Sequence, residues 1–313
     1  LEVTLLPASP EMDTAEEVMA GRAQFGVGTS ELLLKRSRGE PVVLLATIFQ
    51  HSPLVILTKQ TAEISDLQSL AGQTIMLEPQ SAELLAYFKY EGVNPEKLKI
   101  VPHTFEVADL IANRVSAMSA YGTDEPFQME VAGVAYQVFQ PRAGGIDFYG
   151  DNLFTTEGMI QRHPDEVRRF REASLRGWDY ALKHPEQIIN LILSDYDTPK
   201  TRAHLEFEAA HTIPLMHPGL IEVGHTNPGR WRYMADTYAE FGMLPRDFEL
   251  TGFLYDSNPK PDYRWAYWTM AGLGLIALAG LVWALPLWRL NRRLQAAKEA
   301  GSGQEPLSCI HDA

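Results

Sequence analysis

Short apolar runs alternate with amphipathic stretches along the first 140 residues of the chain. The runs at 42–49, 54–58 and 74–77 have the length of buried strands, and a polar or helical segment follows each of them. Helical periodicity is predicted over 12–20, 82–91, 107–112, 124–132 and 164–183, and most of the chain after residue 164 is predicted to be helical. A further strand-like run occupies residues 1–6. Strands and helices that alternate across short connections predict an α/β fold.

A different pattern occupies residues 265–288, where 24 consecutive positions carry no charge. As a helix this segment would reach roughly 36 Å, which exceeds the hydrocarbon core of a membrane at roughly 30 Å. Tryptophan and tyrosine side chains stand near both ends, as in the aromatic belts of membrane helices. The segment therefore predicts one transmembrane helix, and its aromatic ends disfavour the alternative of a core helix in a soluble protein.

The residues that flank this helix predict its orientation. Four basic residues and no acid lie between 289 and 298, whereas the charges just before the helix are balanced. The positive-inside rule makes the stub at 289–313 cytoplasmic and residues 1–264 periplasmic or extracellular, as for a protein of a bacterial inner membrane, with 256–264 as a juxtamembrane linker. Leucines at three- and four-residue spacing after the helix, and the small pair Gly280 and Ala284, suggest a homodimer through this helix; a plain helical extension is the alternative.

The part before the membrane helix contains a weak internal repeat. The sequence AGRA at 20–23 leads through a short strand to GTSE at 28–31, and ANRV at 112–115 leads through another to GTDE at 122–125. Gly21 and Asn113 are residue types that end helices in the left-handed conformation. Each Gly-Thr-x-Glu turn is predicted to join a strand to a helix, where α/β sheets bind ligands. The alternative is turn chemistry that recurs without a shared function.

Two extended segments are predicted to connect two lobes. Residues 46–57 hold two apolar strands around a polar, proline-marked centre, and residues 138–152 supply a return crossing. Two crossings predict a hinge beneath a cleft that closes on a ligand. The predicted organisation is 1–50 for the first part of lobe 1, 51–140 for lobe 2, and 141–255 for the return to lobe 1 with the C-terminal helices.

The charge of the chain excludes one class of partner. There are 27 basic and 40 acidic residues, a net charge of −13, which disfavours a surface for the phosphates of a nucleic acid. The acidic excess lies in residues 1–264, with 23 basic and 37 acidic side chains, and it favours cationic or amine-bearing partners. The single cysteine, Cys309, follows the membrane helix, so no disulfide and no cysteine chemistry are expected before that helix.

One set of polar residues collects at the predicted strand ends, helix starts and hinge segments. These candidate ligand-binding residues are Thr29, Ser30, Glu31, Gln50, His51, Ser52, Glu78, Ser81, Asp124, Glu125, Tyr149, Asp151 and Asn152. Carboxylates outnumber cations, and no Arg or Lys falls in these loops, so we expect a flat, amine-bearing or cationic ligand held by hydrogen bonds, stacking and cation–π contact. The alternative for each carboxylate is a helix cap or a charge that favours the helix dipole.

Signatures of catalysis and metal binding are weak. No phosphate loop, Gly-x-Ser-x-Gly elbow or His-Glu-x-x-His motif occurs. Glu208 and His211 have the spacing of one helical metal-binding pair, whereas a di-iron site needs two. Prolines and a glycine interrupt any common face for the histidines after residue 200, which predicts surface or capping roles for His204, His211, His217 and His225. We predict no metal, no cofactor and no catalytic residue. His51, in the hinge strand, comes closest to a catalytic group.

Four segments in this order resemble one protein family: FGVGTSE at 25–31, FQHSPL at 49–54, YGTDEPF at 121–127 and GIDFYGDN at 145–152. It is the family that includes the bacterial formylaminopyrimidine-binding and alkanesulfonate-binding proteins and the fungal thiamine-pyrimidine precursor synthase. The resemblance covers about residues 1–255 and implies a type II periplasmic-binding fold, with its first strand and an aromatic ligand loop expected before Leu1. It also implies an aminopyrimidine-like ligand. The synthase uses a cysteine-rich motif that this chain lacks before its membrane helix.

The favoured hypothesis is a solute-binding sensor domain that closes on a small nitrogen-rich ligand and relays closure through the membrane helix. Versions of this domain on one membrane helix resemble input modules of signalling proteins, which implies a cytoplasmic output domain. The first alternative is a membrane-anchored binding protein of an ABC transporter for a thiamine precursor or a similar compound. The second is an enzyme that resembles the synthase, which would require turnover dependent on His51.

Overall fold

The structure is a computed structural model that describes residues 1–9, 12–196, 198–258 and 263–301. The chain divides into two compact units, Leu1–Ser257 and Asn258–Ala313. Parts of the predicted linker at 256–264 and of the stub at 289–313 lie outside the described residues, and so does Cys309.

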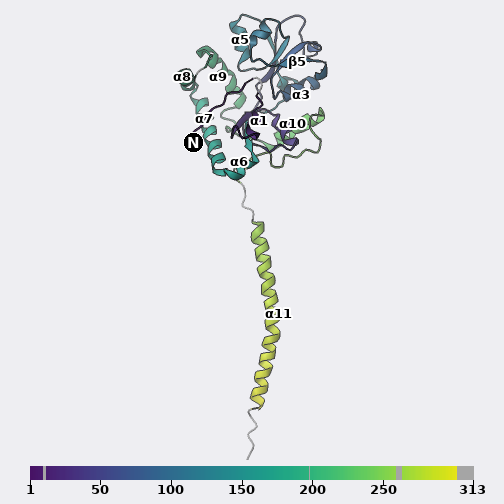
Figure 1. Cartoon of the computed structure of the whole chain (residues 1–313), viewed down its shortest axis with the longest axis vertical. Helices are drawn as coiled ribbons and strands as arrows, with labels where there is room; N and C mark the ends of the chain where they lie inside the picture. The colour runs from purple at the N-terminus through teal and green to yellow at the C-terminus, as the bar shows by residue number, and fades with distance from the viewer. Residues whose placement is uncertain (10–11, 197, 259–262, 302–313) are drawn as a thin grey trace, which may run out of the picture. The chain divides into compact units, whose positions relative to one another are not determined.

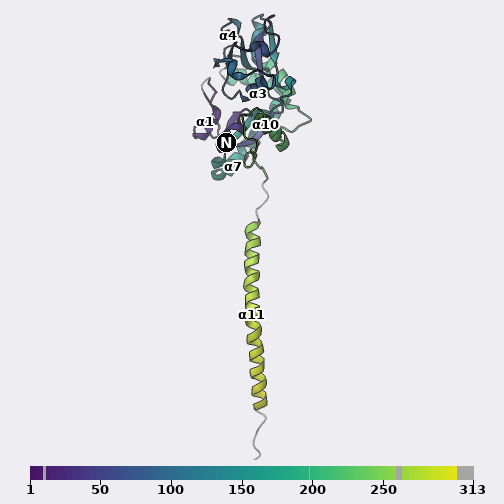
Figure 2. The ribbon, with the colours of Figure 1, turned by 90° about the vertical axis from the view of Figure 1, so that its right-hand side faces the viewer.

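The first unit contains two β-sheets (Figures 1 and 2). A three-stranded antiparallel sheet has the order β1-β8-β2, and a five-stranded mixed sheet has the order β5-β4-β6-β3-β7. The strands are β1 (Gly26–Gly28), β2 (Val42–Phe49), β3 (Leu54–Lys59), β4 (Thr74–Leu77), β5 (Lys99–Pro102), β6 (Ala117–Tyr121), β7 (Tyr136–Phe139) and β8 (Gly150–Thr156). The chain therefore crosses between the sheets twice, from β2 to β3 and from β7 to β8.

Helices cover both sheets and make up most of the unit after β8. They are α1 (Thr14–Met19), α2 (Leu32–Ser37), α3 (Ala82–Tyr90), α4 (Val107–Ile111), α5 (Glu125–Val131), α6 (Glu157–Arg162), α7 (Pro164–Lys183), α8 (Pro185–Asp195), α9 (Arg202–Met216) and α10 (Pro228–Glu240), with short 3-10 turns at Gln68–Leu70, Pro95–Lys97 and Pro141–Gly144. In both views α3 lies toward the end of the unit formed by the five-stranded sheet, and α7 lies toward the other end (Figures 1 and 2).

Most predicted elements are confirmed, several of them at their predicted ends. The bounds of β2, β4 and α7 match the prediction, and the other predicted helices differ by one or two residues at an end. Gly21 and Asn113 adopt φ values of 74° and 58°, and both Gly-Thr-x-Glu turns join a strand to a helix. The strand predicted at 1–6 is wrong, because the described residues include no strand there and Leu5 is 69% exposed. An apolar alternation forms a strand only where a sheet edge pairs with it.

One hydrophobic core cluster runs through both sheets of the first unit. It joins Leu44 and Phe154 of the three-stranded sheet to Ile56 and Ile75 of the five-stranded sheet. Trp231, on α10, is fully buried in the same cluster. This shared core fixes the two sheets against each other and brings the crossing segments and the turns of both sheets together.

The second unit is dominated by one long helix, α11 (Arg264–Gly301). Its segment Trp265–Glu299 has a mean hydropathy of 2.0 at its most apolar part and is long and apolar enough to cross a membrane. None of the residues in this most apolar part is buried in the structure, whereas the core helix of a soluble protein is mostly buried. The helix continues beyond residue 288, so the described part of the stub is helical.

Candidate functional site

The turn at 28–31 packs into the core and against the five-stranded sheet. The Ser30 hydroxyl lies 2.6 Å from the hydroxyl of Tyr238, and both residues are fully buried. The Thr29 hydroxyl donates to the carbonyl of Gln80 over 2.9 Å. Gln80 belongs to the loop between β4 and α3, so this turn ties the three-stranded sheet to the five-stranded one.

Glu31 adds to the same tie rather than capping its own helix. It stands at the N-cap of α2 without a side-chain cap bond, and its carboxylate accepts the N–H of Ala82 at the start of α3 over 3.3 Å. Burial raises the pKa of Glu31. Ser81, at the N-cap of α3, donates its hydroxyl to the carbonyl of Glu78 over 2.7 Å. These side chains organise the contact between the sheets.

The equivalent turn at 122–125 meets α9 instead. One carboxylate oxygen of Asp124 accepts Lys200 Nζ at 2.7 Å, and the other lies 2.5 Å from His204 Nε2. Lys200 also contacts Glu208. Asp124 stands at the N-cap of α5 and makes no side-chain cap bond, and its partners are His204 on α9 and Lys200 just before that helix.

Three carboxyl groups gather around Tyr121, at the end of β6. The Tyr121 hydroxyl donates to Asp151 Oδ1 over 3.0 Å, and the Tyr121 N–H donates to Glu125 Oε2 over 2.7 Å. Glu78, at the end of β4, is close enough for the charges of Glu125 and Asp151 to act on it. We call Glu78, Glu125 and Asp151, with Tyr121, the acidic cluster. Tyr121 was not among the residues predicted from the sequence.

Burial raises the pKa of every carboxyl group in the acidic cluster, and neighbouring negative charges add to the effect for Glu78 and Glu125. Burial, followed by the charge of Glu125, raises the pKa of Glu78 to about 8. Burial and the charge of Asp124 raise the pKa of Glu125 to about 7, and burial raises that of Asp151 to about 6. At neutral pH the cluster therefore holds protons, and a protonated carboxyl group both donates and accepts hydrogen bonds.

Two predicted residues in the crossing segments have structural roles. Asn152 is fully buried, accepts the Thr47 hydroxyl over 3.1 Å and donates to the Gly28 carbonyl over 3.3 Å. The Gln50 side chain donates to the carbonyl of His225 over 3.0 Å. Both side chains hold the crossing segments in place.

His51 is the centre of a polar network in the first crossing. Its Nδ1 lies 2.6 Å from Asp147 Oδ1 and its Nε2 lies 2.8 Å from His217 Nε2. Arg230 lies 3.0 Å from the same Asp147 oxygen and stacks over the Tyr149 ring at 4.3 Å. Burial opposes ionisation of Asp147, but the His51 hydrogen bond and the Arg230 charge outweigh it, so the pKa of Asp147 is lowered.

A cavity of about 240 Å³ opens beside this network. Its lining comes from the first crossing, the β6–α5 turn, the second crossing and the C-terminal half of α9, and it includes His51, Ser52, Asp147 and Glu83. Glu83 is 1% exposed, and its Oε2 has no hydrogen-bond partner among the described residues. Burial raises the pKa of Glu83 to about 8, against a hydrogen bond with Ser52. The lining of the cavity thus includes a buried carboxyl group with an unpartnered oxygen.

The sequence analysis missed Glu83 and the cations near the site. Glu83 lies within the predicted helix 82–91, and its signal was an acid among the apolar positions of that helix. The absence of Arg and Lys from the loops was misleading, because Lys200 and Arg230 reach Asp124 and Asp147 from later in the chain. The surface or capping role was wrong for His204, which is 7% exposed, whereas His217 is the C-cap of α9.

A family model described as NMT1/THI5 like matches residues 1–188, more than half of the chain. The chain belongs to the NMT1/THI5-like family. The resemblance inferred from the four sequence segments is thereby confirmed. Among curated relatives, the riboflavin-binding protein RibY of Chloroflexus aurantiacus is 29% identical over 171 residues, which are 53% of this chain and 48% of that protein. The chain spans about half the length of this relative.

Solved structures place this NMT1/THI5-like chain among periplasmic binding proteins by fold. The alkanesulfonate-binding protein SsuA from Xanthomonas axonopodis pv. citri superposes with a TM-score of 0.59 at 14% identity, over 80% of this chain and 86% of that one. The aliphatic sulphonate-binding protein SsuA from Escherichia coli gives 0.57 at 16% identity, over 79% and 84%. The predicted α/β periplasmic-binding fold is confirmed.

Proposed function

We propose that this NMT1/THI5-like chain is the extracytoplasmic solute-binding domain of a membrane-anchored protein, and that its ligand is a small amine-bearing heterocycle such as an aminopyrimidine. The observation that carries the proposal is the buried carboxyl group of Glu83, a residue that lines the cavity and whose Oε2 has no hydrogen-bond partner among the described residues. An N–H donor of a ligand would satisfy this oxygen, and a buried polar group without a partner costs about 1–3 kcal/mol.

The chemistry of the surrounding residues supports this ligand class. A carboxyl group meets the ring nitrogen and amino group of an aminopyrimidine with two hydrogen bonds, whichever partner holds the proton. The cavity, at about 240 Å³, is smaller than the roughly 300–1,000 Å³ of drug-sized ligand pockets and favours a single ring. The similarity to RibY favours a second candidate, a flavin, which requires a wider cavity.

The apolar helix supports the membrane part of the proposal. With the basic residues after it facing the cytoplasm, the binding domain lies outside a bacterial inner membrane. Ligand binding would then shift the domain toward its closed state, and the membrane helix would relay this change to the cytoplasm, as in a sensor. An anchored binding protein of an ABC transporter uses the same domain and remains the alternative. A reporter fused after residue 301 tests the orientation, since a cytoplasm-dependent reporter is expected to be active there.

Thermal unfolding of the chain in detergent micelles tests the ligand. We expect an aminopyrimidine to raise the melting temperature of the first unit. We expect Glu83→Gln to weaken its binding by at least about 10-fold, because a neutral amide carries no negative charge to pair with a protonated ligand. The matched control is Glu96→Gln, which changes an exposed glutamate outside the lining of the cavity. Unchanged affinity in Glu83→Gln, or no stabilisation by aminopyrimidines or amidines, would overturn this ligand class. Stabilisation by riboflavin alone would support the flavin.

A further inference from the structure

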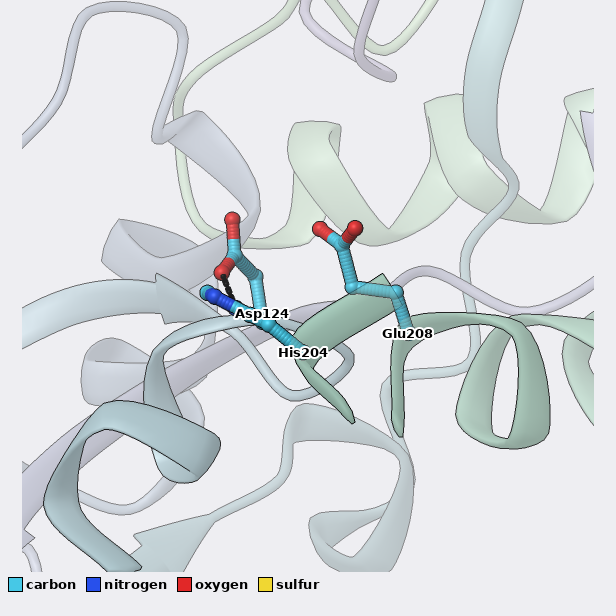
Figure 3. Close-up of side chains that lie close together, drawn as sticks. All are labelled: Asp124, His204 and Glu208. Carbon is cyan, nitrogen blue, oxygen red and sulfur yellow. Dashed lines mark hydrogen bonds and ion pairs between the residues drawn. The ribbon is translucent and has the colours of Figure 1, made fainter. Parts of the chain in front are cut away.

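A second group of side chains lies where α9 passes the turn at 122–125 (Figure 3). Asp124, His204 and Glu208 each offer one ligand atom, and these three atoms lie within 4.8 Å of one another. Figure 3 shows the Asp124 carboxylate beside the His204 ring, with the Glu208 carboxylate next to them on the same helix as His204. We call these three residues the α9 cluster.

The histidine of this cluster is held in place by its surroundings. The His204 ring stacks on Phe127 with a centroid separation of 4.6 Å and an interplanar angle of 23°. Phe127 lies one turn after Asp124. The start of α5 therefore supplies both the aromatic ring that stacks on His204 and the carboxylate that faces the His204 ring. His204 and Glu208 are four residues apart on α9 and share one helix face. His211, which the sequence paired with Glu208, instead hydrogen-bonds the Phe207 carbonyl and is exposed.

The cluster already contains a positive charge. The ammonium group of Lys200 contacts both Asp124 and Glu208, and its side chain is 29% exposed. Lys200 precedes α9, whose N-cap is Thr201, so its side chain can turn out to solvent without unwinding the helix. A site that binds one ammonium group between two carboxylates, with an imidazole nitrogen beside them, also suits a divalent metal ion.

We propose that the α9 cluster binds a zinc-type divalent metal ion through Asp124, His204 and Glu208, in exchange for the Lys200 ammonium group. The sequence analysis had considered Glu208 only with His211, and Asp124 only as a ligand-binding residue. One imidazole and two carboxylates are ligands that Zn²⁺ and Co²⁺ accept, whereas the imidazole disfavours Mg²⁺ and Ca²⁺. Ligand atoms around tetrahedral zinc stand about 3.4 Å apart, so small side-chain rotations close the site, with water as the fourth ligand. The exchange involves no redox step: the metal ion enters the site, and the Lys200 ammonium group turns out to solvent.

The site would link two parts of the solute-binding domain. Asp124 follows β6 of the five-stranded sheet, and the other two ligands lie on α9, whose C-terminal end contacts the first crossing through the carbonyl of Leu215. A bound ion would therefore hold the β6–α5 turn to the helix that also lines the ligand cavity.

Metal titration of the full chain in micelles, without a histidine tag, tests the proposal. We expect Co²⁺ to give the intense visible absorption of a tetrahedral site, which Zn²⁺ removes and Mg²⁺ leaves unchanged. His204→Gln should weaken Zn²⁺ binding by at least about 10-fold because it removes the only nitrogen ligand. Lys200→Met should tighten binding by about 10-fold because it removes a competing charge.

Two histidine variants serve as controls. His211→Gln changes an exposed histidine of the same helix, and His217→Gln tests the His51–His217 pair as another metal site; both should leave Zn²⁺ affinity unchanged. The proposal is overturned if Co²⁺ gives no such absorption, if His217→Gln abolishes it, or if Lys200→Met weakens binding. The Lys200→Met result does not depend on how well His204→Gln folds, and none of these outcomes depends on the solute ligand.

Discussion

The turns at 28–31 and 122–125 differ at one position, Ser30 against Asp124, and both join a strand to a helix. Their surroundings are nevertheless opposite. The first turn buries its serine against Tyr238 and directs its glutamate to the backbone of α3. The second pairs its aspartate with Lys200, just before α9, and with His204 on that helix, and its glutamate joins the acidic cluster.

This difference separates a turn whose polar side chains are used in packing from one whose carboxylates lie beside other titratable groups. The first turn joins the two sheets, and its polar groups have backbone or buried hydroxyl partners. The second turn keeps two carboxylates next to other titratable groups, at the edge of the cavity that contains Glu83. The shared Gly, Thr and Glu positions therefore give both turns the same place between a strand and a helix, while the elements packed against each turn determine the partners of its side chains.

The largest predicted effect comes from exchanging the residue that differs between the turns. Ser30→Asp places a carboxylate in a fully buried position beside Tyr238, so we expect a loss of at least about 3 kcal/mol in the free energy of unfolding. Asp124→Ser should cost about 1–2 kcal/mol, because Lys200 keeps its contact with Glu208. Thermal unfolding followed by near-UV circular dichroism at pH 7 measures both.

Ser30→Ala is the control for that exchange. It removes one buried hydrogen bond and should cost only about 1 kcal/mol, so a larger loss in Ser30→Asp reports the buried charge. Equal losses from Ser30→Asp and Asp124→Ser would contradict the distinction between the turns.

The next prediction concerns the pH dependence of stability and compares Glu125 and Glu31, the glutamates of the two turns. Carboxyl groups whose folded pKa is raised bind more protons in the folded state, so they lower stability as pH rises above their ordinary pKa of 4.5 for Glu and 3.8 for Asp. Glu78, Glu125 and Asp151, with folded values of about 8, 7 and 6, should make stability fall between pH 5 and pH 8.5. Glu125→Gln should recover roughly 1–3 kcal/mol at pH 8.5 and little at pH 5.

Glu31→Gln provides the comparison for this pH effect. The pKa of Glu31 is also raised by burial, but the charge of Lys35 favours its ionised form, whereas the charge of Asp124 disfavours that of Glu125. We therefore expect the melting temperature of Glu31→Gln to follow the wild-type pH profile more closely than that of Glu125→Gln. A flat wild-type profile from pH 5 to pH 8.5 would show that the acidic cluster does not hold protons.

Local pattern was sufficient for most of the fold. The bounds of β2 and β4 follow from continuous apolar runs, and Asn113 marked a helix end because few residue types tolerate a left-handed conformation. The strand expected at 1–6 shows the limit of this reasoning, since alternation is a local property and pairing is not.

The site was less accessible because its partners are distant in sequence. Glu31 and Asp124 were placed at helix starts correctly, but neither side chain caps its own helix, and their partners are Ala82, Lys200 and His204. Charge in a loop says little when a residue 76 positions later supplies the counter-charge, as Lys200 does for Asp124. Only the packing of α9 against the β6–α5 turn brings these groups together.

The smallest predicted effect compares the first residues of the two turns. A Cβ atom at Gly28 would lie 3.3 Å from Gln80 Oε1 and 3.3 Å from Phe154 Cε1, which is tight. A Cβ atom at Gly122 would meet Val55 at 3.4 Å and the Pro53 carbonyl at 3.6 Å, which is ordinary contact. Neither glycine has a positive φ, so backbone strain does not decide the outcome.

Gly28→Ala should therefore destabilise the first unit by about 1 kcal/mol, because the Gln80 side chain must shift and its hydrogen bond to the Thr14 hydroxyl weakens. Gly122→Ala should change stability by less than about 0.5 kcal/mol, since its contacts are normal and alanine restricts the unfolded chain. A melting-temperature difference of a few degrees between the two variants measures this effect. If Gly122→Ala is the more damaging variant, the second turn is packed more tightly than the first, and its side chains are not free to serve a ligand. The opposite order supports a first turn fixed by packing and a second turn fixed mainly by charge.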